Sequence, residues 1–158
     1  MEVTNMNLMR NTLAAGALLG ALALPMLAHA DPCKVEISGN DMMQYDKQQL
    51  SVPATCKEIT VTLHHAGKQP KEVMGHDWVL VHTPDMAAVD QAGLAAGLAN
   101  NYVQPGDKRV LAHTKVIGGG DTTSVTFPAS ILKKGGDYSY LCTFPGHSAL
   151  MHGKFIFG

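Results

Sequence analysis

A cysteine, a histidine and a methionine stand near the C-terminal end of the chain with the spacing C-x4-H-x3-M. They are Cys142, His147 and Met151, and a turn containing Pro145-Gly146 lies between the first two. One loop therefore offers a thiolate, an imidazole and a thioether. Soft sulfur ligands with imidazole suit copper, and two histidines, one cysteine and a weak axial methionine form a blue, or type 1, copper site. The segment predicts a copper-binding loop.

The second histidine of such a site must come from elsewhere in the chain. His76 is the best candidate, because it stands between a glycine and the start of a strand in the segment Met74-Gly-His-Asp-Trp78. Each residue alone has a simpler interpretation: methionine and cysteine often fill a core, and a loop histidine is often a surface residue. Their combination in one loop favours copper.

The three cysteines support a special function for Cys142. In an oxidising compartment the economical arrangement is one disulfide and one thiol with another function. Cys33 and Cys56 would close a short loop, which leaves Cys142 unpaired. An idle thiol is a liability in such a compartment, so a metal-binding or catalytic function is expected for Cys142.

The N-terminus predicts export from the cytoplasm. Residues 1–30 have Arg10, an apolar stretch from Leu13 to Leu27 and the cleavage pattern A-x-A at residues 28–30, as in a secretory signal peptide. The apolar stretch is shorter than the ~18–20 residues of a membrane span, and a membrane anchor is the alternative. Cleavage before Asp31 would leave one mature domain, residues 31–158.

Composition excludes several classes of partner. Lysine and arginine number 12 against 13 acidic residues, so the chain lacks the basic excess that nucleic acids or anionic membranes attract. The hydrophobic content of 46% is typical of a globular protein rather than a disordered one. The mature chain is long enough to bury a real core.

Strand patterns dominate the mature region, and the strands that they predict would position the copper ligands. Period-two alternation or short apolar runs, bounded by Gly, Pro and Asn turns, predict eight strands. They cover residues 34–38, 48–52, 58–64, 78–82, 109–113, 122–127, 137–142 and 153–157. Thr83-Pro84-Asp85 is typical of a helix start, and an alanine-rich helix is expected from there to Asn100. The prediction is an all-β, eight-stranded Greek-key β-sandwich with one helical flap.

The chain resembles the azurins of the cupredoxin, or blue copper, family. The segment C-T-F-P-G-H-S-A-L-M from Cys142 to Met151 is similar to the azurin ligand loop throughout, and the likeness extends over the mature region. It includes Gly39-Asn-Asp41, the Cys33/Cys56 pair and Val73-Met-Gly-His76. The resemblance implies a cupredoxin-like fold in which His76, Cys142 and His147 bind one copper ion. Met151 would be axial and the Gly75 carbonyl would approach from the opposite side.

The resemblance also implies a function and a docking surface. An azurin-like protein would be a monomeric periplasmic carrier that cycles Cu(II)/Cu(I) and exchanges single electrons with c-type cytochromes and with respiratory or denitrification reductases. It would not be an enzyme, would not bind nucleic acid and would not insert into the membrane after signal cleavage. The apolar patch used for docking would comprise Met43, Met74, Phe144, Pro145, Ala149 and Leu150.

Two positions next to the ligands depart from the azurin pattern. Asp77 stands where azurins have asparagine, and Gly119 stands where they commonly have serine. Together with Thr143, these positions are expected to lie around the ligand residues, where such groups tune a metal site. An ionised Asp77 would add negative charge near the copper and favour Cu(II). We therefore expect a lower reduction potential than in azurins with the Asn/Ser pair.

The sequence favours electron transfer over three other functions. A copper oxidase or nitrite reductase domain would need further histidine clusters, and the chain has no H-x-H motif. Copper storage or delivery favours exchangeable Met- or His-rich sites rather than a rigid loop. A cysteine hydrolase would need an oxyanion-hole or base signature beside Cys142. A blue copper site also has no open position for a substrate, unlike a catalytic metal.

Overall fold

The structure is a computed structural model that describes Met1 and residues 31–158, so the predicted signal peptide lies outside the described residues. Alternating apolar and polar residues form nine strands in this part of the chain. They are β1 (Lys34–Asn40), β2 (Gln44–Tyr45), β3 (Gln49–Val52), β4 (Glu58–His65), β5 (Val79–His82), β6 (Val110–His113), β7 (Thr122–Pro128), β8 (Tyr138–Leu141) and β9 (His152–Phe157).

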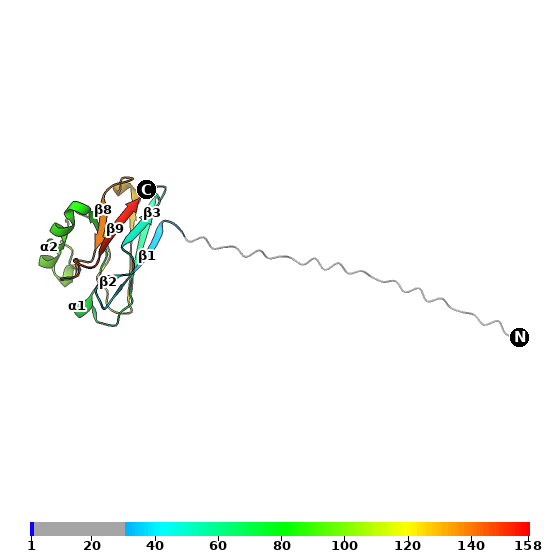
Figure 1. The fold of residues 1–158 in the computed structure, drawn as a ribbon, viewed down its shortest axis with the longest axis horizontal. Coiled ribbons are helices and arrows are strands. Elements are labelled where there is room, and N and C mark those ends of the chain that lie inside the picture. The colour runs from blue at the N-terminus through cyan, green and yellow to red at the C-terminus, as the bar shows by residue number, and fades with distance from the viewer. Residues whose placement is uncertain (2–30) are drawn as a thin grey trace.

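The strands form two sheets that pack face to face. One sheet has four strands in the order β2-β1-β4-β7, and the other has five in the order β3-β9-β8-β5-β6. Two pairs are parallel, β1 with β4 and β3 with β9, and the other pairs are antiparallel. Figure 1 shows the C-terminal end of β9 at the opposite end of the molecule from the short helix α1 (Lys71–Met74). The predicted β-sandwich is confirmed.

The inner faces of the two sheets form the main core. Strand β4 alternates buried and partly exposed residues along its length, as a strand covered on one face should. Trp78 is fully buried at the centre, where its ring packs against Phe127, Tyr140 and Phe155 at centroid distances of 6.0–6.4 Å. Burial of four large aromatic side chains supplies much of the hydrophobic stabilisation of such a sandwich.

Strand β5 is covered on both faces, as its continuous apolar sequence predicts. Leu80 points into the main core, whereas Val79 and Val81 belong to a second apolar cluster. This second cluster includes Val89 of the helix α2 (Met86–Ala96). Helix α2 therefore covers the outer face of the five-stranded sheet, and it lies beside β8 in Figure 1.

The helical segment is more divided than the sequence predicts. The chain forms a 3-10 turn at Thr83–Asp85, then α2, then a second 3-10 turn at Leu98–Asn100. Gly97 separates the last two with a φ of +71°, a backbone conformation that favours glycine. Helix α1 and strand β2 were not predicted, because four and two residues are too short to show a periodic pattern.

The predicted disulfide is confirmed. Cys33 and Cys56 are bonded, and their Cα atoms lie 5.7 Å apart. The bond joins the residue before β1 to the segment that leads into β4, its parallel neighbour. It therefore fixes this end of the four-stranded sheet covalently, and Cys142 is left as the free, buried cysteine of the described chain.

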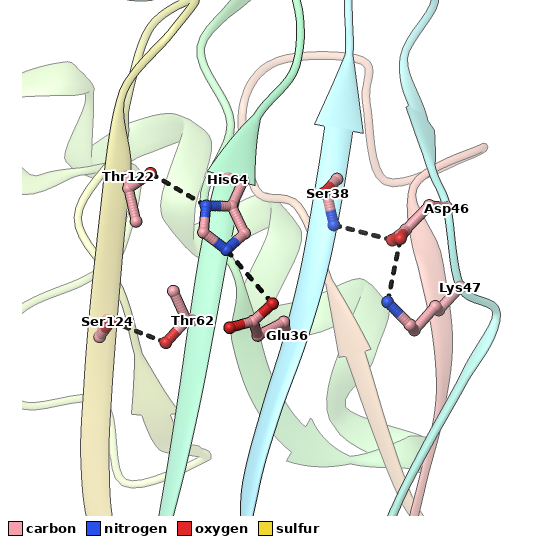
Figure 2. Close-up of polar contacts among 8 residues, drawn as sticks. All are labelled: Glu36, Ser38, Asp46, Lys47, Thr62, His64, Thr122 and Ser124. Atoms are coloured by element: carbon pink, nitrogen blue, oxygen red, sulfur yellow. Dashed lines mark hydrogen bonds and ion pairs between the residues drawn. The ribbon is translucent and has the colours of Figure 1, made fainter. Parts of the chain in front are cut away.

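The outer face of the four-stranded sheet carries polar side chains. His64 Nδ1 lies 3.0 Å from Thr122 Oγ1, and the hydroxyl groups of Thr62 and Ser124 lie 2.9 Å apart (Figure 2). His64 Nε2 lies 3.8 Å from a Glu36 carboxylate oxygen. These cross-strand contacts belong to a solvent-facing surface, and each adds little to stability.

Candidate metal centre

Two histidines and the free cysteine meet at one end of the sandwich. The ligand atoms of His76, Cys142 and His147 all lie within 4.8 Å of one another, and the three side chains are at most 2% exposed. His76 follows helix α1 and pairs with Ile117 in an isolated bridge just before β5, Cys142 follows β8, and His147 lies in the loop before β9. The β5–β8 pairing brings the first two segments together, and the loop folds His147 back over them.

The ring of His76 is oriented for metal binding. Its Nε2 lies 2.8 Å from the Asn40 carbonyl oxygen, which only accepts hydrogen bonds, so Nε2 carries the proton. Its Nδ1 is buried and has no hydrogen-bond partner among the described residues. A buried polar atom without a partner is costly, and a metal ion at this lone pair would supply the missing interaction. The donor set therefore fits a bound metal.

Neighbouring groups hold the His76 ring from its other sides. The ring of His65 stacks on it with a centroid distance of 4.2 Å. His65 is fixed in turn, because its Nε2 donates to the Met74 carbonyl at 2.7 Å and its Nδ1 accepts from the Gly67 amide at 3.0 Å. A Cβ atom at Gly39 would come within 2.6 Å of the His76 ring, so only glycine fits there. The ring is positioned by the protein itself.

Burial keeps the two histidines in the neutral form that a metal requires, but it keeps the cysteine protonated. It lowers the pKa of His76 and of His147 to about 4, so both rings are neutral at pH 7. The sulfur of Cys142 lies 3.7 Å from His147 Nδ1. Burial raises the pKa of the Cys142 thiol well above its usual range, while the backbone amides of Asp77 and Phe144 favour the thiolate. Metal binding must therefore release the thiol proton, and the two amides are placed to stabilise the resulting thiolate.

Met151 and Gly75 lie beside these three ligands. Met151 is fully buried and packs in one apolar cluster with Cys142, Phe144 and Val116. Gly75 is the residue before His76, and a Cβ atom there would come within 2.9 Å of the Phe144 ring and within 2.6 Å of Val116. A side chain at this position would displace the wall of the site, so glycine permits the close approach of the backbone.

Asp77 and Thr143 connect the two ligand segments. The amide and the hydroxyl of Thr143 donate to the two carboxylate oxygens of Asp77 at 2.8 and 2.5 Å. Tyr45 donates a further hydrogen bond to the Asp77 carbonyl. Because Asp77 follows His76 and Thr143 follows Cys142, these bonds tie one metal ligand to the other. Burial raises the pKa of the Asp77 carboxyl to about 6, partly offset by the Thr143 hydrogen bonds.

Gly119 lies against a different loop. A Cβ atom at this glycine would come within 2.5 Å of the Lys68 backbone and 2.7 Å of the Gly67 carbonyl. The Gly119 amide donates to the Gln69 carbonyl at 2.8 Å, which fixes the same approach. Close packing against residues 67–69 therefore explains why glycine occupies this position. A side chain there would require this loop to move.

The residues of the predicted docking patch differ widely in exposure. Pro145, Ala149 and Leu150 are exposed, and Leu150 shows 62% of its surface. Met43 and Met74 are half-buried, and Phe144 is buried, with its ring 4.6 Å from that of His147. Met42 (67% exposed) and Val73 (59% exposed) are apolar residues that the sequence did not single out, and they are more exposed than Met43 or Met74.

Comparison with known proteins gives the family of the chain. Residues 31–158 match the family described as copper binding proteins, plastocyanin/azurin family. The chain belongs to this family. It is 52% identical to the azurin of Bordetella pertussis over 91% of this chain and 95% of that protein. It is 51% identical to the azurin of Pseudomonas aeruginosa over 92% of this chain and 97% of that protein.

A solved structure gives the same result. The azurin Az-iso2 of Methylomonas sp. strain J superposes with a TM-score of 0.77 at 45% identity, over 80% of this chain and 98% of that one. As a plastocyanin/azurin-family protein, the chain is a copper protein, and His76, Cys142 and His147 are positioned to hold the ion. Bound copper would satisfy the Nδ1 atom of His76 that the protein leaves without a partner.

Sequence reasoning did not single out the contribution of Asn40. Its carbonyl oxygen orients His76, and a backbone carbonyl has no signature in side-chain chemistry. The only signal was the turn Gly39-Asn-Asp41, one of the stretches on which the resemblance to the azurins rests. The turn is therefore part of the metal centre as well as the end of a strand.

Proposed function

We propose that this protein carries single electrons through one copper ion that His76, Cys142 and His147 would hold, with Met151 and the Gly75 carbonyl as further ligands. Copper supplies reversible one-electron exchange when bound in such a site. Membership in the plastocyanin/azurin family supports a blue copper electron-transfer protein. The observation that carries the proposal is the buried, pre-oriented His76–Cys142–His147 cluster.

The protein contributes rigidity and exclusion of water. His76 is fixed by Asn40 and His65 without the metal, and the bonds from Thr143 to Asp77 fix the Cys142 segment to it. Ligands held in place move little when the charge of the ion changes, which lowers the reorganisation needed for electron transfer. The ligand set also leaves no open position for a substrate, so we propose a carrier rather than an enzyme.

We propose that partners dock where the ligand loop reaches the surface. Pro145, Ala149 and Leu150 are exposed, and they precede and follow the buried His147 along the chain. An apolar surface beside a buried redox centre suits brief contact with redox proteins such as c-type cytochromes or terminal reductases. We further propose that the protein acts as a monomer in the periplasm after cleavage before Asp31.

The first test is the visible absorption and EPR spectrum of the protein after addition of Cu(II). An intense blue thiolate-to-copper band with narrow copper hyperfine splitting is expected, and Cys142→Ser should abolish both. Two matched methionine variants test whether Met151 is a ligand, because Met151 belongs to the apolar cluster at the site and Met43 packs against that cluster. Met151→Leu should change the spectrum and Met43→Leu should leave it unchanged. A pale spectrum of ordinary tetragonal Cu(II) in the wild type would refute the blue site.

The docking surface is tested by the rate of electron exchange with a reduced c-type cytochrome in a stopped-flow instrument. Leu150→Lys should slow the reaction, because it places a charge on the proposed patch. Ile156→Lys is the matched control, since Ile156 is an exposed apolar residue (42%) on β9 away from the ligand loop. Equal rates for both variants would place docking elsewhere.

N-terminal sequencing of the exported protein tests cleavage before Asp31.

A further inference from the structure

A second group of metal-binding side chains lies between helix α2 and the start of β9. His152, Met86 and Asp90 line one hollow of about 290 Å³, together with Ser148 and Leu141. Met86 and Asp90 come from α2, and His152 is the first residue of β9, next to Met151. None of the three belongs to the copper centre described above.

Strand pairing and packing bring the groups from both elements to the same place. His152 pairs with Leu141 across β8 and β9, so their side chains stand on the same face of the sheet. Met86 packs against the apolar cluster that contains Leu141. Leu141 is therefore a common neighbour of Met86 and His152, and all three line the hollow.

The imidazole of His152 has the arrangement of a metal ligand. Its Nδ1 lies 2.8 Å from the Ser148 carbonyl oxygen, and because a carbonyl only accepts, Nδ1 carries the proton of the neutral ring. Nε2 is then the atom with a free lone pair. Metal-binding histidines typically donate their other N–H to a carbonyl or carboxylate in this way, which fixes the ring and its tautomer. His152 is exposed, so an ion can reach it from solvent.

The charge at the hollow favours a cation. One oxygen of Asp90 accepts a hydrogen bond from the Ser148 hydroxyl at 2.8 Å, and the other is buried without a hydrogen-bond partner among the described residues. Lys154 borders an adjoining hollow, but its ammonium group is engaged by Asp137 at 2.9 Å. A neutral imidazole, a neutral thioether and one carboxylate would balance a single positive charge.

We propose that His152, Met86 and Asp90 form a second metal site, specific for a soft monovalent ion such as Cu(I). Thioether ligands select Cu(I) and imidazole suits copper, whereas oxygen-rich sites select harder ions. The carboxylate of Asp90 compensates the charge. The site is separate from the blue copper centre and does not depend on its electron-transfer function.

The test counts Cu(I) ions bound to the protein after its blue site has been filled and reduced. Cu(I) is added in competition with the chromogenic chelator bicinchoninate, and the wild type should bind a second ion per chain. His152→Gln and Met86→Leu should each weaken this second binding at least about tenfold, the usual scale for a disturbed metal site. The blue band after reoxidation should be unchanged in both, which shows that the first site remains filled.

Substitution of a histidine and a methionine outside the hollow distinguishes a specific site from nonspecific binding. His113 is also exposed, and its Nδ1 donates to the Thr114 carbonyl at 2.9 Å, but its hollow contains no thioether. Met42 is an exposed methionine away from the hollow. His113→Gln and Met42→Leu should therefore leave the second ion bound. A single bound ion in the wild type, or equal losses in the control variants, would overturn the proposal.

A measurement on the unsubstituted protein gives an independent answer. Ag(I) is a diamagnetic ion with the ligand preference of Cu(I), and it can be added to the reduced protein during NMR. The methyl signal of Met86 and the ring signals of His152 should shift together with one ion added, before those of Met42 or His113. Shifts confined to the latter two residues would contradict the proposed site.

Discussion

The two ends of strand β1 are fixed by different kinds of interaction. At its start, Cys33 is bonded covalently to Cys56, and the neighbouring residues join the apolar core. At its far end, Gly39 and Asn40 hold the His76 ring by a close approach and one hydrogen bond. The first end closes a loop and stabilises the folded chain, whereas the second positions a ligand. Metal geometry is therefore expected to respond to substitutions at the far end of β1 and not to loss of the disulfide.

Loss of the disulfide should have the largest effect on stability and the smallest on copper. Cys33→Ser with Cys56→Ser opens a loop between residues 23 positions apart, so the free energy of unfolding should fall by about 3 kcal/mol. Urea denaturation of the metal-free protein measures this. The blue absorption band of the copper form should remain where it is, because no ligand contacts the disulfide. A shifted band would show that the two ends of β1 are coupled.

Substitution of Gly39 should change the copper site as well as the stability of the fold. A Cβ atom there would lie 2.6 Å from Cδ2 of His76 and 3.2 Å from the methyl carbon of Met151, so Gly39→Ala must displace at least one of these side chains. We expect a loss of about 1–3 kcal/mol in the free energy of unfolding, as in other overpacked cores, and altered copper hyperfine splitting in EPR.

Gly158→Ala is the matched control at the C-terminus, because a Cβ atom there meets nothing within 4 Å. It should leave both stability and spectrum unchanged. An unchanged EPR spectrum in Gly39→Ala would mean that the His76 ring is not confined by the end of β1.

The charge of Asp77 should change the reduction potential of the copper ion. The pKa of Asp77 is raised to about 6 by burial, so the carboxyl is ionised at pH 8 and its charge favours Cu(II). Asp77→Asn removes the charge and should raise the reduction potential by about 59 mV or more, a tenfold change in a one-electron equilibrium. Protein-film voltammetry at pH 8 measures this.

Glu58→Gln is the matched control for Asp77→Asn, because it removes the same charge from the exposed start of β4, near the disulfide. Its potential should equal that of the wild type. An unchanged or lower potential in Asp77→Asn would contradict the proposed effect of the buried charge.

The two ends of β1 also differ in how far they could be predicted from the sequence. The disulfide, the eight longer strands and the Cys142–Met151 loop follow from cysteine count, periodicity and local spacing. The contacts at the far end of β1 do not, because they depend on a backbone carbonyl at Asn40 and on the missing side chain of Gly39. Neither feature has a side chain whose chemistry would reveal it. Burial of Phe144 was also hidden, since its packing against His147 and Tyr102 is set by tertiary contacts.

The smallest expected effect concerns Asp41, which lies just beyond the metal end of β1. Its carboxylate accepts hydrogen bonds from the Lys68 amide at 2.8 Å and the Gln69 amide at 3.3 Å, and the bond from Lys68 is the main cause of its lowered pKa. A carboxyl whose pKa is lowered by folding stabilises the protein above its ordinary pKa of 3.8, and this contribution is lost as the pH falls through the lower folded value.

Asp41→Asn should therefore reduce the stability of the metal-free protein slightly at pH 7, and the difference from the wild type should vanish toward pH 2. Urea midpoints across this pH range measure it. Asp31→Asn is the matched control at the disulfide end, where the carboxylate accepts one bond from the Cys33 amide at 3.0 Å. Because residues 67–69 also hold His65 and Gly119, only Asp41→Asn should broaden the copper EPR signal. Equal broadening in both variants would mean that the two ends of β1 do not act independently.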